Sequence, residues 1–338
     1  MRPVVRSVAG TDNLGEMVLA WPEGFRRVPE EPWVSAPIET LALKYDTVET
    51  HGWYRNLEPT VDDLAGYLRD GQILVDYSAG TGILCDRLLK RVPKLAAGVL
   101  LVDASPKFLR LALEKLGHDA RVALRWIRYL KEAKRLERLD EVVPEGFHAD
   151  ALVSTNAIHL YYGLDETLKS WRKVVRPGGR VFVQSGNIRN PAAREGEWII
   201  DETVDAIHLA AMEIVKGEDR WAAYRDVKNM PAYDDLRAKY FLPMRPLDHY
   251  LNALRTAGFR IHSLRKRTIE ANVSEWYDFL AVYHEGVLGW VGGSEKIEGK
   301  RPAEEAVRDR LALIRAAMDK VFKGRARFDC CWTYVTAE

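Results

Sequence analysis

The chain has 338 residues, of which 47% are hydrophobic, enough for a substantial core in one large domain or in two. Its 50 basic and 49 acidic side chains leave a formal net charge of +1, which gives no electrostatic basis for binding nucleic acid or an anionic membrane. No apolar run reaches about 18 residues, so we expect no transmembrane helix, and the N-terminus lacks the apolar region of a secretory signal.

The first 50 residues carry prolines and tryptophans with weak periodicity, and we expect this segment, 1–50, to wrap over the rest of the molecule. From residue 51 onward, apolar strands alternate with amphipathic helices, which predicts a parallel sheet with helices on both faces. The predicted strands are 72–77, 97–105, 121–127, 149–157 and 179–186. The predicted helices are 60–69, 82–92, 106–117, 131–143 and 165–175.

After Gly186 the pattern changes. Residues 190–245 are helix-forming and contain no clear strand, so we predict a helical insert there, placed as a lid after the fifth strand. The remainder returns to helix and strand, with a charged helix around 302–323 and a last strand over 327–337. We therefore assign 51–189 and 246–338 to the core of the fold.

A loop of small residues connects the first predicted strand to its helix. Tyr77-Ser78-Ala79-Gly80-Thr81-Gly82 would let a ligand approach the backbone closely, and the next helix would point its N-terminus at that ligand. A tight turn without a ligand would have the same pattern. The next strand ends in Asp103, an acid that can accept both hydroxyls of a ribose or cap the helix that begins at Pro106.

The order D-Y-S-A-G-T-G, V-D-A-S, S-T-N-A-I-H-L-Y and V-V-R-P-G-G-R-V-F-V resembles the class I S-adenosylmethionine-dependent methyltransferases, and most of all their small-molecule branch. The resemblance covers roughly residues 55–187. It implies a Rossmann-like α/β fold, with a seven-stranded, mostly parallel sheet and a reversed hairpin at one edge. It also implies S-adenosyl-L-methionine as the cofactor, lying across the strand ends.

The same resemblance implies which residues bind the cofactor. Asp76, Gly80 and Gly82 would border its amino-acid part, and Asp103 would bind the ribose. Ser78, whose hydroxyl could hold the carboxylate of the donor or a water, Ala79 and Asn156 are the other candidate cofactor-binding residues. Ser78 departs from the family pattern, because it stands in place of the first glycine. The acid that often ends the third strand is also missing, which leaves the adenine contact unassigned.

A nicotinamide-dependent oxidoreductase is the weaker alternative. Its G-x-G-x-x-G fingerprint would need a glycine at position 85, where this chain has Cys85. The other cysteines, Cys330 and Cys331, are adjacent in the last strand, and no spacing suggests a metal site. We expect a reduced, cytoplasmic protein.

Two histidines are candidate general bases for an acceptor that carries a proton. His159 follows the fourth strand, and His284 lies in the aromatic segment 274–292, which we expect to return over the pocket. Each would also suit a packed structural role. The candidate substrate-binding residues are Asn187, Arg189, Tyr283 and Trp290. Asn187 and Arg189 could instead anchor the helical insert, and the aromatic residues could belong to the core.

The segment after the fourth strand, Ser154-Thr155-Asn156-Ala157, has neither the N/D-P-P-Y/F sequence of DNA amino-methyltransferases nor the Pro-Cys of cytosine-5 enzymes. We therefore expect methyl transfer to the oxygen or nitrogen of a small-molecule acceptor, with no nucleic-acid or membrane partner and with a homodimer left open. A non-catalytic, regulatory protein that binds S-adenosylmethionine is the alternative. The identity of the acceptor is not encoded in these motifs.

Overall fold

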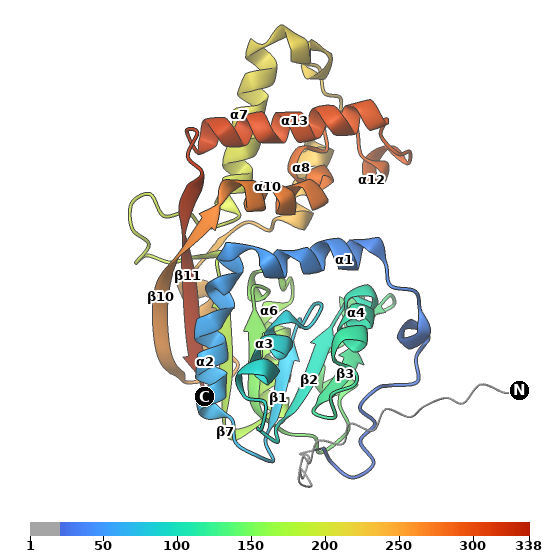
Figure 1. Ribbon diagram of the computed structural model, residues 1–338, viewed down its shortest axis with the longest axis vertical. Helices are drawn as coiled ribbons and strands as arrows, with labels where there is room; N and C mark the ends of the chain where they lie inside the picture. Colours follow the sequence, from blue (N-terminus) through green and yellow to red (C-terminus); the bar gives the residue numbers. More distant parts are fainter. Residues whose placement is uncertain (1–20) are drawn as a thin grey trace, which may run out of the picture.

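Seven strands form one central sheet in the order β10–β11–β7–β6–β1–β2–β3 (Figure 1). The computed structural model describes residues 21–338, so the first part of the predicted N-terminal segment, residues 1–20, lies outside it. All neighbours from β7 to β3 are parallel, while β11 runs antiparallel to both β7 and β10. The predicted sheet with its reversed edge hairpin is confirmed. The strands are β1 (Ile73–Tyr77), β2 (Gly98–Asp103), β3 (Val122–Trp126), β6 (Ala149–Thr155), β7 (Val175–Ser185), β10 (Ile261–Asn272) and β11 (Arg327–Ala337).

Helices cover both faces of this sheet because successive strand side chains point to opposite sides. Leu74 and Leu101 pack in one core with α2 (Glu58–Tyr67), α3 (Ile83–Arg91) and α4 (Pro106–Leu116). Val75 and Leu100 pack in a second core with α6 (Leu164–Val174) and α9 (Leu247–Thr256). The central strands are therefore buried on both faces, as continuous apolar runs predict.

The predicted helix over 131–143 is wrong. Its first half forms a hairpin of β4 (Tyr129–Leu130) and β5 (Arg135–Leu136), and only α5 (Leu139–Val142) is helical. The chain reverses through Lys134, which has a φ of 51°. Glu141 then binds Arg135 at 2.8 Å and Arg138 at 2.9 Å. The charges that resemble a helical pattern thus pair across a turn.

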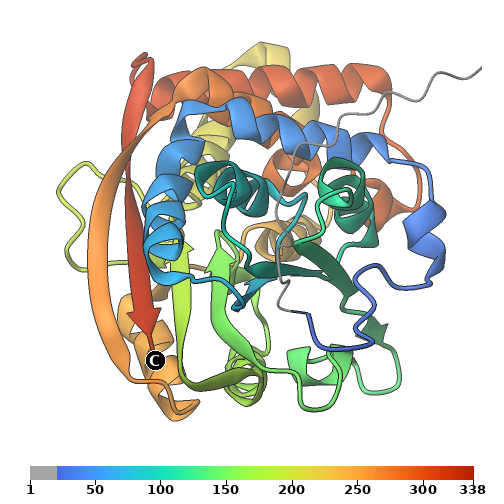
Figure 2. The same cartoon turned by 60° about the horizontal axis from the view of Figure 1, so that its bottom comes forward.

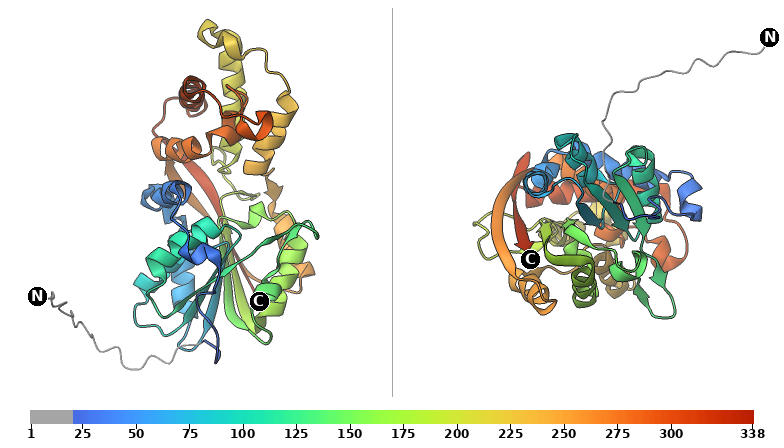
Figure 3. Two further views of the ribbon diagram at one scale, coloured as in Figure 1. Left: turned by 90° about the vertical axis from the view of Figure 1, so that its right-hand side faces the viewer. Right: turned by 90° about the horizontal axis from the view of Figure 1, so that it is seen from below.

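A second, helical layer lies beyond the carboxyl ends of the parallel strands, and we call it the cap (Figures 1 and 3). The cap has two parts that are far apart in the sequence, and α13 packs on α7 while α11 packs on α8. The first part contains α7 (Glu202–Gly217), η5 (Asp219–Tyr224) and α8 (Met230–Tyr240). The second part contains α10 (Val273–Val282), α11 (His284–Leu288), α12 (Glu295–Glu298) and α13 (Glu304–Val321).

The second part of the cap corrects the predicted domain boundaries, which place all of 246–338 in the core. The long strands β10 and β11 rise from the edge of the sheet to the cap, and the helices between them join the 190–245 insert there (Figure 2). An amphipathic helix such as α13 has the same pattern whether it packs on a sheet or on other helices. Its sequence therefore could not show which layer it joins.

The N-terminal segment enters between the two layers. Its helix α1 (Thr40–Asp46) contacts both α4 of the core and α10 of the cap. Short turns of η1 (Pro32–Ser35), η2 (Thr47–Thr50) and η3 (Gly52–Leu57) lie on either side of it along the chain. A small pair, β8 (Ile188–Arg189) with β9 (Arg245–Pro246), brings together the two ends of the 190–245 insert. Within residues 21–338, no helix combines the length and hydropathy that crossing a membrane requires.

Candidate active site

The loop after β1 is shaped by three residues with left-handed backbones. The φ angles are 65° at Ser78, 56° at Gly80 and 80° at Gly82. This path turns the amide of Gly80 toward the end of β2, where it donates a hydrogen bond of 2.8 Å to Asp103 Oδ2. The first two strand ends are thereby joined into one concave surface, which we call the donor cradle.

Asp103 is the charged group of the donor cradle. Its Oδ1 accepts a second hydrogen bond, of 2.7 Å, from the amide of Ser105. Burial raises the pKa of Asp103, while the backbone hydrogen bonds from Ser105 and Gly80 lower it. A carboxylate fixed in this way, with lone pairs still directed into a cavity, is well suited to accept hydrogen bonds from the two hydroxyls of a ribose. The residues present therefore fit the adenosyl donor that the sequence implies.

The two glycines of the loop serve different purposes. Gly80 lines the cavity, where a Cβ would meet the ring of Tyr45 at 3.7 Å. Gly82 faces the core, because a Cβ there would lie 2.8 Å from Leu116 Cδ1 and 3.1 Å from Leu101 Cδ2. Gly82 therefore allows α3 to approach α4 and β2, and it does not line the cavity as a cofactor-binding residue would.

Two other predicted cofactor-binding residues also lie outside the cavity. Asp76 is 1% exposed, and neither of its carboxylate oxygens has a hydrogen-bond partner. Burial, assisted by the charge of Asp103, raises the pKa of Asp76 to about 8. Ala79 packs against the core below the loop. Both residues lie beneath the cradle and do not form its surface.

Ser78 does line the cavity, but its hydroxyl already has a partner. It lies 2.9 Å from the hydroxyl of Tyr161, which in turn lies 2.9 Å from Ser154 Oγ. This link holds the loop after β1 to the end of β6. The serine in place of the family's first glycine therefore ties two strand ends together.

The donor cradle opens into a cavity of about 420 Å³ between the sheet and the cap. Its walls come from the strand ends, the N-terminal segment and the cap. The predicted site residues that line it are Ser78, Gly80, Asp103, Asn156, His159, Asn187 and Tyr283. The lining residues that sequence reasoning missed include Tyr45, Trp53, Tyr54, Phe108, Leu136, Asp201, Tyr240, Phe241, Trp276, Phe279 and Trp332.

Asn156 anchors the middle of the cavity floor at the end of β6. Its backbone has a φ of 52°, and its side-chain amide donates to Asn56 Oδ1 at 3.1 Å. Trp332 Nε1 donates to Asn156 Oδ1 at 3.0 Å, and Gln184 Nε2 donates to Asn56 Oδ1 at 3.0 Å. Asn156 therefore links η3 and β11 to the end of β6, and no feature of the sequence pointed to Asn56 as its partner.

His159 lines the cavity in a form that is unsuited to act as a base. Its Nε2 lies 2.9 Å from Asn187 Nδ2, an atom that can only donate, so this nitrogen accepts. Its Nδ1 therefore carries the proton and faces Ser185 Oγ at 3.1 Å. Burial lowers the pKa of His159 to about 3. Because both ring nitrogens are occupied, this arrangement does not favour the predicted role of His159 as a general base.

The remaining predicted residues are not brought to the cavity. His284 Nδ1 accepts a hydrogen bond of 2.8 Å from Arg310, on α13, inside the cap. Trp290 is buried in the cap core. Arg189 is exposed and pairs with Glu202 at 2.7 Å. His284 is therefore not a base of this site, and Arg189 and Trp290 do not touch the space in which a substrate would lie.

Aromatic side chains dominate the cap side of the cavity. Trp276 and Phe279 of α10, together with Tyr283 directly after that helix, line the cavity, and Trp276 stacks on Phe279 with ring centroids 5.0 Å apart. Across the donor cradle, Tyr45 stacks on Phe108 at 4.8 Å. The expected return of the 274–292 segment over the pocket thus places its first half there. The i, i+3, i+7 spacing was the signal that could have selected these three residues.

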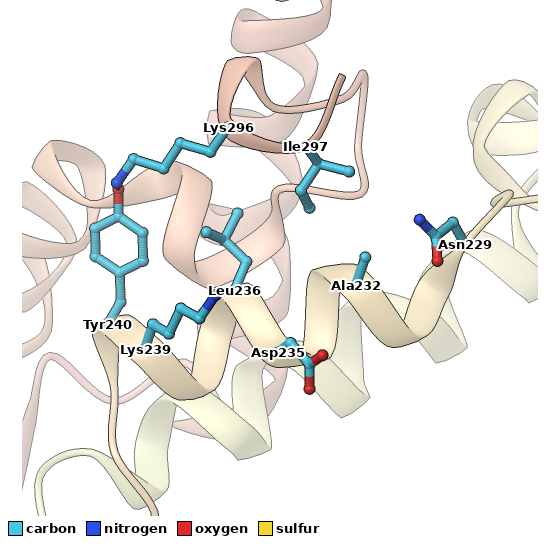
Figure 4. Close-up of a pocket in the computed structure, with 8 residues that line it drawn as sticks. All are labelled: Asn229, Ala232, Asp235, Leu236, Lys239, Tyr240, Lys296 and Ile297. Carbon is cyan, nitrogen blue, oxygen red and sulfur yellow. The ribbon is translucent and has the colours of Figure 1, made fainter. Parts of the chain in front are cut away.

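A second hollow, of about 500 Å³, lies on the surface of the cap between α8 and α12 (Figure 4). Tyr240 lines both this hollow and the inner cavity. The side chain of Lys296 reaches the Tyr240 hydroxyl, as Figure 4 shows, and its ammonium lies 4.3 Å from the ring centroid. Tyr240 is therefore the side chain that stands between the outer hollow and the inner cavity.

Comparisons with known proteins agree with this geometry. A sequence profile of the methyltransferase domain family matches residues 75–181. Among curated proteins, the hybrid PKS-NRPS synthetase apdA of Emericella nidulans is 31% identical over 109 residues, which are 31% of this chain and 3% of that protein. The chain therefore spans a small part of the length of that relative.

Solved structures with a similar fold include the YcgJ protein of Bacillus subtilis, with a TM-score of 0.48 at 10% identity over 84% of this chain and 97% of that one. A SAM-dependent methyltransferase from Geobacter sulfurreducens, in complex with S-adenosyl-L-homocysteine, has a TM-score of 0.47 at 14% identity over 89% of this chain and 98% of that one.

The family match covers the strands and loops that build the donor cradle, from β1 to β7. The match therefore covers the part of the chain that forms the donor cradle. The matched domain is a methyltransferase, which favours methyl transfer over the nicotinamide-dependent alternative. Residues 75–181 of the chain match the methyltransferase domain family, within the seven-stranded fold that the sequence resemblance implied.

Proposed function

We propose that the chain transfers the methyl group of S-adenosylmethionine to the oxygen or nitrogen of a small molecule held beneath the cap. The observation that carries this proposal is the continuity of the cavity. Gly80 and Asp103 of the donor cradle line the same 420 Å³ space as Phe279 and Tyr283 of the cap. Donor and acceptor would therefore meet in one cavity.

On the donor side, the chain binds the S-adenosylmethionine and sets its orientation. Asp103 would hold the ribose hydroxyls, and the ring of Phe108 would lie beside the base, since both line the cavity at the end of β2 and the start of α4. The sulfonium supplies an activated methyl group with its own leaving group. The main task of the protein is therefore alignment of the acceptor with that methyl group.

On the acceptor side, the lining indicates the chemical class of the substrate. Trp53, Trp276 and Phe279 offer apolar faces, whereas Asn187 and Asp201 place polar groups at the end of β7 and the start of α7. Pockets of this composition bind molecules with a largely apolar body and a few polar groups. We infer an apolar or aromatic acceptor with a hydroxyl or amine directed at Asn187 and Asp201.

We further propose that the cap acts as a lid. We expect part of the cap to move when an acceptor enters the space between α10 and the sheet. The side chain of Tyr240, between the outer hollow and the inner cavity, marks one place where such an opening would begin. The helices α8 and α12 that carry Tyr240 and Lys296 would then form the moving edge.

The test is methyl transfer from methyl-labelled donor to fractionated pools of small molecules. We expect label in one or a few low-molecular-weight products with the wild type and a strong loss of label with Asp103→Ala at limiting donor. Binding of S-adenosylhomocysteine, measured by calorimetry on the same preparations, separates the alternatives. Donor binding without transfer to any pool would instead support a non-catalytic binding protein.

A further inference from the structure

Asp201 is a carboxylate that the mechanism described so far leaves without a role. It precedes α7 as the N-cap residue, yet its side chain makes no capping hydrogen bond to that helix. It is 7% exposed, and it lines the cavity together with Asn187 and His159. A buried acid that turns from its own helix toward a substrate cavity calls for a functional explanation.

The position of Asp201 is fixed by a short chain of hydrogen bonds. The backbone amide of Asp201 donates to Asn187 Oδ1 at 2.9 Å. This bond sets the orientation of the Asn187 amide, so its Nδ2 faces His159 Nε2 at 2.9 Å. His159 in turn donates from Nδ1 to Ser185 Oγ. The chain runs from the end of β7 to the start of α7 and holds Asp201 in place.

Burial and neighbouring groups set the pKa of the Asp201 carboxyl group close to neutral pH. The pKa of Asp201 is raised to about 7, mainly by burial; the hydrogen bond from the Asn187 side chain opposes this rise, and the nearby charge of Asp205 adds to it. The thiol of Cys330, on β11, is the neighbouring titratable group of the sheet, and its own pKa is raised well above the ordinary range. His159 stays neutral because burial disfavours its charged form.

We propose that Asp201 is the general base that removes the acceptor proton during methyl transfer, with Asn187 and His159 as positioning residues. This inference rests on the proposed function. In the step, the lone pair of the acceptor oxygen or nitrogen forms the bond to the methyl carbon. The bond from that carbon to sulfur breaks with its electron pair left on sulfur, and the acceptor proton passes to the Asp201 carboxylate.

The arrangement of the strands supports this division of labour. The donor cradle follows β1 and β2, and Asp201 adjoins the end of β7, with the end of β6 between them. Neighbouring strands lie about 4.8 Å apart, so roughly 10 Å separates β1 from β7. That distance leaves room for the reacting atoms of donor and acceptor between Gly80 on one side and Asp201 on the other.

The test compares wild type, Asp201→Asn and Asp205→Asn with the acceptor identified by labelling. Asp201→Asn keeps the shape but cannot take a proton, so we expect turnover to fall by about 10²–10⁴-fold while S-adenosylhomocysteine binds as before. In the wild type, kcat/KM should rise with pH and level off above about 7. Asp205→Asn removes a neighbouring negative charge, so that rise should move to lower pH with the same plateau.

A readout that needs no acceptor accompanies the kinetics. Infrared difference spectra of the protein with bound S-adenosylhomocysteine should show a protonated carboxyl band that disappears near pH 7 and is missing in Asp201→Asn. Absence of that band from the wild type would overturn the proposal even if no acceptor were found. So would an Asp201→Asn variant that keeps its turnover and pH profile, or one that raises KM alone. A protein that binds donor but methylates nothing contradicts the proposed function instead.

Discussion

The donor cradle faces a second side of the same cavity, the aromatic lining that includes Trp53, Trp276 and Phe279, which we call the acceptor wall. The two sides are built in different ways. The cradle comes from a loop of a few residues after β1 and a single acid at the end of β2, held by backbone hydrogen bonds. The acceptor wall gathers aromatic side chains from the N-terminal segment, α8, α10 and β11. A site for an invariant cofactor can be local in sequence, whereas a site for a particular substrate is assembled from distant segments.

The largest expected effect concerns the acid beneath the cradle. Asp76 has a pKa of about 8 in the folded protein, against about 3.9 in an unfolded chain. Because the folded state holds the proton more tightly, Asp76 lowers stability increasingly as pH rises from about 4 to about 8. Asp76→Asn removes that penalty. Each pKa unit is worth about 1.4 kcal/mol, so we expect a gain of up to a few kcal/mol at pH 8.

Urea unfolding at pH 5 and at pH 8 measures this effect. The stability difference between Asp76→Asn and wild type should be small at the lower pH and larger at the higher one. A difference that does not change with pH would show that Asp76 is already ionised or solvated in the folded protein. Donor affinity should stay close to that of the wild type, since Asp76 does not line the cavity.

The next effect is on the surface of the cradle. Asp103→Ala removes a charged acceptor of hydrogen bonds from the ribose, a loss of roughly 1.5–3 kcal/mol, so S-adenosylhomocysteine should bind about tenfold to a hundredfold more weakly by calorimetry. Asp62→Ala, an exposed carboxylate on α2, is the matched control and should bind normally. Unchanged affinity of Asp103→Ala would remove Asp103 from the ribose site.

The contrast between the two sides explains what the sequence could predict. Alternating apolar strands and helices predicted the sheet, because burial on both faces leaves a clear pattern in β1 and β2. Ser78, Gly80 and Asp103 could be named because a short loop and a strand end carry the whole cradle. Even there, Asp76 and Gly82 were assigned to the surface although they lie beneath it. Spacing alone does not show which way a side chain points.

The residues of the acceptor wall could not be predicted from local sequence patterns. Trp53 and Phe279 meet in the cavity, with ring centroids 6.0 Å apart, although more than half of the chain lies between them. His159 and His284 were chosen for their titration range, but hydrogen bonds from Asn187 and Arg310 occupy them. These partners follow from tertiary packing. Only the spacing along α10 offered a usable signal.

A smaller effect should appear on the acceptor side alone. Phe279→Ala removes a half-buried ring from the wall, worth on the order of 1 kcal/mol, so KM for the acceptor should rise about fivefold while S-adenosylhomocysteine affinity is unchanged. Leu209→Ala, an exposed apolar residue of α7, is the control. A loss of donor affinity in Phe279→Ala would mean that the two sides of the cavity are not separate sites.

The smallest effect concerns the lid. If α8 and α12 move to admit the acceptor, their amide hydrogens should exchange more slowly once S-adenosylhomocysteine is bound, while α6 in the core should be unaffected. Hydrogen exchange followed by mass spectrometry resolves these segments. Equal protection of the cap with and without ligand would identify it as a fixed layer and would leave the opening at Tyr240 without support.

The most direct test of the account is a crystal structure with S-adenosylhomocysteine bound. We predict the ribose hydroxyls within hydrogen-bonding distance of Asp103, the adenine beside Phe108, and the sulfur directed past the end of β6 toward the side of the cavity that Asp201 lines. A ligand bound in the outer hollow near Lys296, or one whose sulfur points away from Asp201 and the aromatic wall, would contradict the proposed division of the cavity.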